Sequence, residues 1–125
     1  MKISIILPFY NEEKTIGLTI ECLRSQSLIA NEIIFVDSGS DDNTVKIINE
    51  AATKYPALHI KTLFSGKMSP SSSVNLGIKK SINNMIVYMD CGLDIPSNWL
   101  ESQAISYGRK KIDIISGRIY TEGTN

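Results

Sequence analysis

Two carboxylates in this chain directly follow strand-like apolar runs, where they could bind a ligand or a metal. The apolar segment 85–89 is followed by Asp90, and Gly92 allows a sharp turn two residues later. A continuous apolar run ended by a turn signal is typical of a strand buried on both faces of a parallel sheet. Open α/β sheets bind ligands at the carboxyl ends of such strands. We therefore expect Asp90 to hold a divalent metal; the alternative is that it only caps the following turn.

The second carboxylate, Asp37, ends the strand-like segment 32–36 and opens a polar stretch that runs to residue 42. The loop 8–11 follows the first apolar run in the same way. In a parallel sheet these strand ends meet at one edge, where their carboxylates and hydroxyls offer the hard oxygen ligands that suit Mg²⁺ or Mn²⁺. Neither GxGxxG nor GxxxxGK[ST] follows the first run, which weighs against a Rossmann dehydrogenase and a P-loop enzyme.

An alternation of apolar runs and helical patterns must position these residues. It predicts one α/β domain over residues 1–125, with three α/β/α layers and a mostly parallel, Rossmann-like sheet. Pro8 cannot donate to a central ladder, so we expect the first strand to stop there, and Asn11 is the predicted N-cap of the first helix. The predicted strands cover 3–7, 32–36, 59–64, 85–89 and 112–120, and the predicted helices cover 12–24, 44–55, 74–82 and 97–107, with a loop over 65–73.

Composition narrows the classes of function. Thirteen basic and thirteen acidic residues leave no formal net charge, so there is no global electrostatic reason to expect nucleic-acid binding. The first apolar run is too short for a transmembrane helix and lacks the small residues of a signal-peptide cleavage site, which predicts a cytoplasmic location. Cys22 and Cys91 lack metal-site spacing and are expected to be reduced thiols. His59, without a partner histidine, is not expected to be catalytic.

Four motifs in a fixed order carry a resemblance to a known family. They are Ile-Ser-Ile-Ile-Leu-Pro-Phe-Tyr-Asn-Glu at 3–12, Val-Asp-Ser-Gly-Ser-Asp-Asp-Asn-Thr at 36–44, Asn-Leu-Gly at 75–77, and Met-Asp at 89–90 with Pro96 downstream. Together they resemble the family 2 glycosyltransferases over nearly the whole chain. The resemblance implies the nucleotide-sugar-binding portion of a GT-A fold, a nucleotide-diphosphate sugar as ligand, with UDP as the expected nucleotide, Mn²⁺ or Mg²⁺ as cofactor, and sugar transfer with inversion.

The resemblance also assigns roles around the nucleotide. It places Pro8, Tyr10 and Glu12 around the base and ribose, with the Tyr10 ring offering a face for stacking. Asp37 would hydrogen-bond the base or the ribose, and such a charge-assisted bond contributes about 1.5 to 3 kcal/mol. Asn75 would lie near the nucleotide or support the loop around it.

A further set of residues concerns the metal and the second helix. Asp90 matches the first acid of the family's DxD motif, which binds the metal that bridges the two phosphates. The second acid is replaced by Gly92, and Asp94 is the candidate substitute as a metal ligand. Ser40, Asp42 and Thr44 match the family's start of the second helix, where helix capping is the alternative to ligand contact.

Two further departures from the family pattern bear on activity. Many members carry a basic residue shortly before the Asn-x-Gly motif, where this chain has Ser-Ser-Ser-Val at 71–74, so Lys67 is the candidate counter-charge for the pyrophosphate. In the family the general base and the acceptor site come from the part that follows the metal motif. This sequence ends at Asn125, so we assign no catalytic residue and expect the chain alone to be a poor or inactive transferase.

Two other functions compete with donor binding. Gly92 and the serine run favour a degenerate, non-catalytic interaction or assembly module with the same fold. A nucleotidyltransferase shares the layered fold but needs a glycine-rich, basic loop where this chain has Pro-Phe-Tyr-Asn-Glu-Glu at 8–13. The last predicted strand leaves an open sheet edge, through which we expect self-association. In a complete protein, peripheral attachment at the inner face of a membrane is compatible with the cytoplasmic prediction.

Overall fold

The computed structural model describes residues 2–109, within which no helix is long and apolar enough to cross a membrane. Strands and helices alternate along these residues, as the sequence predicts. In chain order the elements are β1 (Ile3–Phe9), α1 (Ile16–Arg24), β2 (Glu32–Asp37), α2 (Thr44–Lys54), the 3₁₀ turn η1 (Pro56–Leu58), β3 (Ile60–Phe64), α3 (Pro70–Lys80), β4 (Met85–Tyr88) and α4 (Trp99–Arg109).

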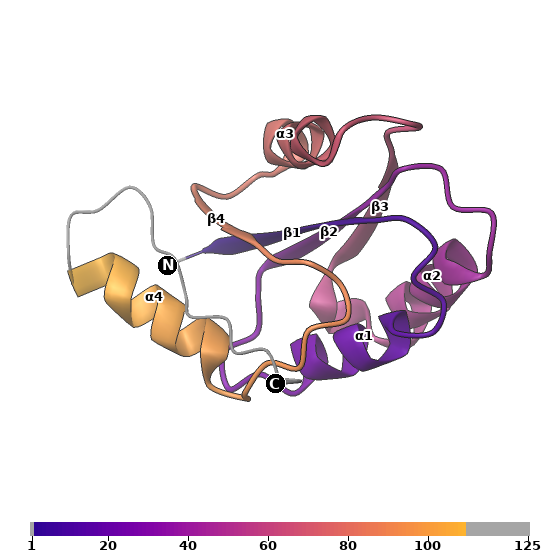
Figure 1. The fold of residues 1–125 in the computed structure, drawn as a ribbon. Coiled ribbons are helices and arrows are strands. Elements are labelled where there is room, and N and C mark those ends of the chain that lie inside the picture. Colours follow the sequence, from indigo (N-terminus) through magenta and orange to yellow (C-terminus); the bar gives the residue numbers. More distant parts are fainter. Residues whose placement is uncertain (1, 110–125) are drawn as a thin grey trace, which may run out of the picture.

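The described strands form one parallel sheet in the order β3-β2-β1-β4. Figure 1 shows α3 over one face of this sheet, with α1, α2 and α4 toward the other face. This is a three-layer α/β/α arrangement, so the predicted fold class is confirmed. The predicted strand over 112–120 lies outside the described residues.

Alternate residues of each strand pack into the two layers, because successive side chains of a strand point to opposite faces. The larger core lies against α1 and α2 and includes Phe9 and Phe35, whose rings meet edge to face at 6.2 Å. Ile6 and Val36 belong to the smaller core, against α3. That helix approaches the sheet closely because residue 77 is glycine: a Cβ at Gly77 would lie 2.6 Å from Cγ2 of Ile6.

Pro8 does not end β1, contrary to the prediction from sequence. The strand continues to Phe9, whose carbonyl accepts a hydrogen bond from the N–H of Ser38 on the β2 side (3.0 Å), whereas the carbonyl of Ile6 accepts from Met89 on the β4 side (3.2 Å). Because backbone groups alternate along a strand, Pro8 faces the same neighbour as Ile6. Its missing N–H therefore ends the pairing with β4 only, and pairing with β2 runs on through Pro8.

The first helix also begins later than predicted, at Ile16. Asn11 has a φ of +49°, whereas an N-cap residue normally has the extended backbone of the β region. The carbonyl of Glu12 accepts from the N–H groups of Thr15 (3.0 Å) and Ile16 (2.8 Å), which makes a turn before the helix proper. Residues 11–13 therefore present their N–H groups outside any helix.

The third helix begins earlier than predicted, at Pro70 instead of residue 74. Ser69 is its N-cap, and the Oγ atom of this serine accepts from the N–H of Ser72 at 3.2 Å. Proline suits the first helical position because no intrahelical partner is lost there. The predicted loop over 65–73 is correspondingly shorter.

The apolar sequence before Asp90 predicted a strand buried on both faces. Among residues 2–109, however, only one face of β4 is fully covered. Within the described sheet β4 is an edge strand, and its last residue, Tyr88, is 49% exposed. Met85 and Val87 are buried, so only one face of the strand is covered fully. The other edge of the described sheet is β3, and self-association through a sheet edge stays a prediction.

A buried carboxylate lies at the amino end of the sheet, opposite the strand ends that carry the candidate ligand residues. Glu32, the first residue of β2, is 1% exposed. It accepts hydrogen bonds from Oγ of Ser4 (2.8 Å), from the N–H of Ile82 (3.1 Å) and from the ammonium group of Lys61. Burial favours the neutral acid, but these donors outweigh it, and the pKa of Glu32 is lowered.

We expect Glu32→Gln to lower the free energy of unfolding at pH 7 by about 1–3 kcal/mol, because the amide weakens hydrogen bonds that a buried carboxylate accepts. Since the folded-state pKa of Glu32 lies below the unfolded value, its stabilisation is present above the unfolded pKa and is lost as the pH falls through the folded pKa. Urea unfolding between pH 7 and pH 3 should therefore show the deficit of the variant shrinking in acid.

Glu50→Gln, at an exposed position on α2, is the matched control and should change stability little at any pH. A deficit of Glu32→Gln that stays constant down to pH 3 would contradict the stabilising role of the ionised carboxylate.

Candidate functional site

The loop after β1 is joined to the loop after β2 by a row of hydrogen bonds, here called the loop seam. Three consecutive N–H groups of the first loop, left outside α1, are accepted by three side chains of the second loop. The pairs are Asn11 N to Ser40 Oγ (2.9 Å), Glu12 N to Thr44 Oγ1 (3.0 Å) and Glu13 N to Asp42 Oδ2 (3.2 Å). The seam therefore holds the two loops against each other.

The seam is completed by two bonds in the opposite direction. Oδ1 of Asn11 accepts from the N–H of Asp41 (2.9 Å), and the Asn43 amide donates to Oε1 of Glu13 (2.7 Å). Ser40 and Thr44, for which capping and ligand contact were the two alternatives, therefore bridge between loops. Capping of α2 by itself does not account for them.

Asp37 lies at the end of β2 with its side chain turned into the start of this second loop. It is 5% exposed, and its Oδ1 atom accepts from the N–H groups of Gly39 (3.1 Å) and Ser40 (2.8 Å). Gly39 has a φ of +102°, which a non-glycine residue would adopt only with strain. Within the described residues Oδ2 of Asp37 makes no hydrogen bond, so one carboxylate oxygen is available to a ligand.

Asp90 lies just beyond β4 and is exposed to solvent. Its Oδ1 atom accepts a hydrogen bond of 2.6 Å from the phenol of Tyr88. This bond, together with partial burial, raises the pKa of Tyr88 to about 12. The phenol therefore remains protonated, and remains a donor, across the physiological pH range.

The loop after β4 is docked against α1 at Gly92. The N–H of Gly92 donates to Oγ1 of Thr19 (2.8 Å), and its φ is +86°. A Cβ at this position would lie 3.4 Å from Oγ1 of Thr15, which itself donates to Oε2 of Glu12 (2.7 Å). The backbone at position 92 is thus one that glycine adopts readily and that an aspartate would adopt only with strain.

The structure joins the β1 and β2 strand ends through the seam, and the β4 end through α1. The strand order also reverses direction between β1 and β4, and such a switch point is where open α/β sheets bind ligands. Pro8 is half-buried at this edge, and the Tyr10 ring is 54% exposed beside it. The Glu12 carboxylate is engaged with Thr15, and Asn75 lies on the exposed side of α3.

The residues present fit a divalent metal only in a limited way. No group of three His, Cys, Asp or Glu side chains lies together within residues 2–109. Asp94 is exposed, and its Oδ1 atom lies 3.9 Å from Sγ of Cys22 on α1. Mg²⁺ is commonly held by one or two carboxylates together with substrate phosphates. Asp90 therefore suits a metal shared with a diphosphate, whereas a separate all-protein metal site is not formed here.

Three serine hydroxyls beneath the start of α3 were missed by sequence reasoning. Ser73 is fully buried, and its Oγ atom lies 3.3 Å from that of Ser38 and 3.0 Å from that of Ser65. They tie the first turns of α3 to the ends of β2 and β3. The serine-rich sequence indicated only a loop, because no local pattern reveals contacts across 35 residues.

Cys91, next to Asp90, is unsuited to act as a nucleophile. Burial, together with the nearby charges of Glu12 and Asp90, raises the pKa of the Cys91 thiol to about 12. Since the thiolate is the reactive form, this thiol is unreactive at neutral pH.

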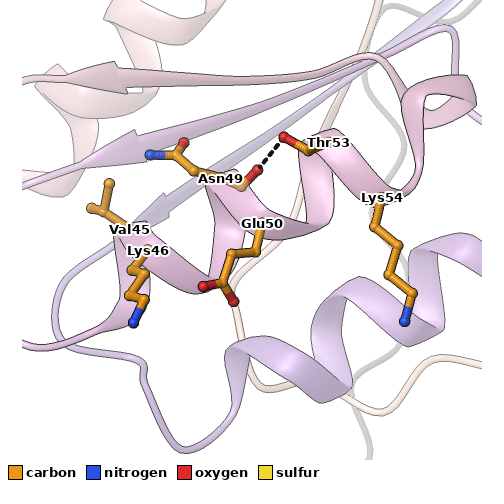
Figure 2. A pocket seen from close by; sticks show the side chains of 6 residues that line it. All are labelled: Val45, Lys46, Asn49, Glu50, Thr53 and Lys54. Carbon is orange, nitrogen blue, oxygen red and sulfur yellow. Dashed lines mark hydrogen bonds between the residues drawn. The ribbon is translucent and has the colours of Figure 1, made fainter.

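An open surface depression of about 730 Å³ lies along α2 and is not the candidate site. Figure 2 shows that a single helix supplies its lining. The Thr53 hydroxyl already donates a hydrogen bond to the carbonyl of Asn49. Neither Asp37 nor Asp90 reaches it, so polar groups from different elements do not converge there. The lining residues are Val45, Lys46, Asn49, Glu50, Thr53 and Lys54.

An open parallel sheet with oxygen-bearing side chains at its switch point defines an α/β ligand-binding domain. The model of the family "Glycosyl transferase family 2" matches residues 4–125, and the chain belongs to this family. Cholesterol galactosyltransferase of Borreliella burgdorferi is 33% identical over 113 residues, which are 90% of this chain and 30% of that protein. Glycosyltransferase AglE of Haloferax volcanii is 26% identical over 119 residues, which are 94% of this chain and 39% of that protein.

Solved structures agree on the fold. S. aureus TarS 1–349 in complex with UDP matches with a TM-score of 0.76 at 24% identity, over 98% of this chain and 38% of that one. Mannosyltransferase PcManGT of Pyrobaculum calidifontis, in complex with GDP-Man and Mn²⁺, matches with a TM-score of 0.66 at 22% identity, over 71% and 27%. The predicted GT-A fold and family are therefore confirmed. The chain spans only 30% to 39% of the length of the two curated relatives named above.

We expect Gly92→Ala to lower the free energy of unfolding by about 1–2 kcal/mol, because a side chain at this positive φ is strained. Gly92→Asp restores the second acid of the family motif but introduces a side chain at the same backbone, so we expect it not to strengthen Mn²⁺ binding. Thermal unfolding and Mn²⁺ titration followed by electron paramagnetic resonance measure the two effects.

Gly17→Ala is the matched control: that glycine lies within α1 with no atom within 4 Å of an added Cβ. It should stabilise the protein by about 0.5–1 kcal/mol. Undiminished stability of Gly92→Asp together with tighter Mn²⁺ binding would contradict the account of position 92.

Proposed function

We propose that this chain binds a nucleotide-diphosphate sugar at the ends of β1, β2 and β4, as the donor-binding portion of an inverting glycosyltransferase. The proposal rests on one arrangement: the loop seam joins the ends of β1 and β2, and α1 holds the loop after β4. Asp37 and Asp90 each keep a carboxylate oxygen free of protein hydrogen bonds within residues 2–109. Family membership supports it. Similar solved structures also support it, since they are complexes with UDP, UDP-GlcNAc or GDP-Man.

In this proposal the nucleoside lies against the loop seam. The exposed ring of Tyr10 stacks on the base, and Oδ2 of Asp37 accepts a hydrogen bond from the base or the ribose. Pro8 and Ser40 shape the floor of the site, with the Ser40 hydroxyl held toward the loop by Asn11. Uridine diphosphate is the expected nucleotide. Asn75, exposed on α3, borders the nucleotide or supports the loop before it.

The diphosphate lies toward the end of β4. There Asp90, with Asp94 as the candidate second ligand, would hold Mn²⁺ or Mg²⁺ together with phosphate oxygens. When bound, the metal neutralises charge that develops on the leaving diphosphate. Asp94 is compatible with this role because it is exposed and its one described partner is the weakly interacting thiol of Cys22. Lys67, in the loop before α3, is the candidate basic residue for the same diphosphate.

Sugar transfer itself needs groups that we do not assign to this chain. An inverting transfer requires a general base for the acceptor hydroxyl and a site that positions the acceptor. We therefore propose donor binding for this chain and transferase activity for a longer protein. A non-catalytic assembly module is the second candidate function, favoured by the glycine at position 92; it predicts no donor binding at all.

Calorimetric titration with UDP, with and without Mn²⁺, tests the proposal. The wild-type chain should bind UDP more tightly in Mn²⁺, and Asp90→Ala should lose this metal-dependent gain, because the carboxylate contributes to metal affinity. Asp94→Asn measures the second ligand: a reduced Mn²⁺ dependence assigns it to the metal, and an unchanged one leaves Asp90 as the protein ligand. A folded wild-type chain that binds no UDP would favour the assembly module.

Asp37→Ala should weaken UDP binding at least tenfold, through loss of a charge-assisted hydrogen bond. Alanine also removes two turn-forming hydrogen bonds, so Asp37→Asn is the sharper variant, since its amide oxygen can still accept from Gly39 and Ser40. Asp41→Ala, at a neighbouring exposed carboxylate, is the matched control. Equal UDP affinity of Asp37→Asn and the wild-type chain would remove the proposed role of Oδ2.

A further inference from the structure

The end of β4 carries a short hydrogen bond that the donor-binding proposal does not use. Tyr88 and Asp90 are two residues apart, so their side chains leave the extended chain on the same side. The phenol donates to Oδ1 of Asp90 at 2.6 Å. Both side chains are exposed enough to be reached by a ligand, Tyr88 to 49%.

The two partners differ in how firmly the fold holds them. Tyr88 is still part of the sheet, where it pairs with Ile6 of β1, and the next residue, Met89, is buried and donates its N–H to the Ile6 carbonyl. Asp90 lies past the last ladder bond, at the start of the loop that turns at Gly92. Within the described residues the phenol is the only hydrogen-bond partner of its carboxylate.

An exposed carboxylate without partners rotates among several orientations, and fixing it costs conformational entropy when a ligand binds. This cost is more serious here than in a site with two acids, because the backbone at position 92 disfavours a second one. A phenol on the rigid strand that engages one oxygen restricts this rotation and leaves the other oxygen free. It does so without adding charge next to the single acid.

We propose that Tyr88 is a positioning residue, which orients the Asp90 carboxylate so that its Oδ2 atom is free to bind the metal that the diphosphate shares. The inference rests on the proposed donor-binding function and adds a residue to it. Tyr88 does not contact the metal in this account and acts only through Asp90. Its effect is therefore confined to the metal-dependent part of nucleotide binding.

Tyr88→Phe tests the inference, because it removes the phenol oxygen and keeps the ring. We expect it to weaken UDP binding in Mn²⁺ by about threefold to tenfold, the range that corresponds to the net contribution of one typical hydrogen bond, because the bond is exposed and acts only through Asp90. UDP binding without metal and the melting temperature should be unchanged. Tyr55→Phe, at a tyrosine that ends α2 and faces Arg24, is the matched control and should alter neither.

A double-mutant cycle separates positioning from direct contact. In the Asp90→Ala background, Tyr88→Phe should have no further effect on UDP binding, since the group that it orients is gone. An equal loss in both backgrounds would mean that the phenol contacts the nucleotide itself, and would overturn the inference.

Two other outcomes would also overturn it. If the wild-type chain gains UDP affinity from Mn²⁺ and Tyr88→Phe gains as much, the positioning role fails while donor binding stands. If the folded wild-type chain binds no UDP, donor binding fails and the role of Tyr88 fails with it. Mn²⁺ affinity in the presence of UDP, measured by electron paramagnetic resonance, provides a readout that a purely structural role would not change.

Discussion

The N–H groups of residues 11–13 impose the constraint on which the candidate site depends. The turn before α1 leaves them without helical partners, and the polar side chains after β2 accept them. Five hydrogen bonds join the two loops, so neither loop can move away from the other without breaking the seam. The loop after β4 is fastened to Thr19 of the helix that follows the same turn. The sheet places the three strand ends, and the turn with the helix that follows it holds the loops after β2 and β4.

Sequence reasoning predicted the fold well because the fold is encoded in local patterns. Apolar runs alternate with amphipathic segments, and this pattern was sufficient for the parallel sheet and the two helical layers. The errors lie at the ends of elements, where the outcome depends on contacts or backbone angles that the local sequence does not show. Pro8 was taken to end a strand, but its missing N–H matters only toward β4; Asn11 was taken as an N-cap, but its backbone turns to a positive φ. Pro70 begins a helix, although its serine-rich surroundings read as a loop.

The candidate site could be predicted as a set of residues, but its internal connections could not. Asp37 and Asp90 follow strand ends in the sequence, so a parallel sheet was sufficient to place them at the same edge. That Asp37 uses one oxygen to hold its own loop, and that Ser73 joins two strand ends, depends on contacts between segments far apart in the chain. The spacing of Tyr88 and Asp90 did contain a signal, since residues i and i+2 of a strand share a side. The glycine at position 92 was visible as a departure, while its reason lay in a backbone angle.

Pro8 keeps β1 and β4 apart at the point where their ladder stops. Pairing with β4 ends at Ile6, because the nitrogen of Pro8 carries no hydrogen and cannot donate to β4. The two strands therefore form a fork beyond this point. A ligand that enters this fork does not have to separate paired strands first. The free energy of association is then not reduced by a prior rearrangement of the sheet, which is the thermodynamic meaning of preorganisation.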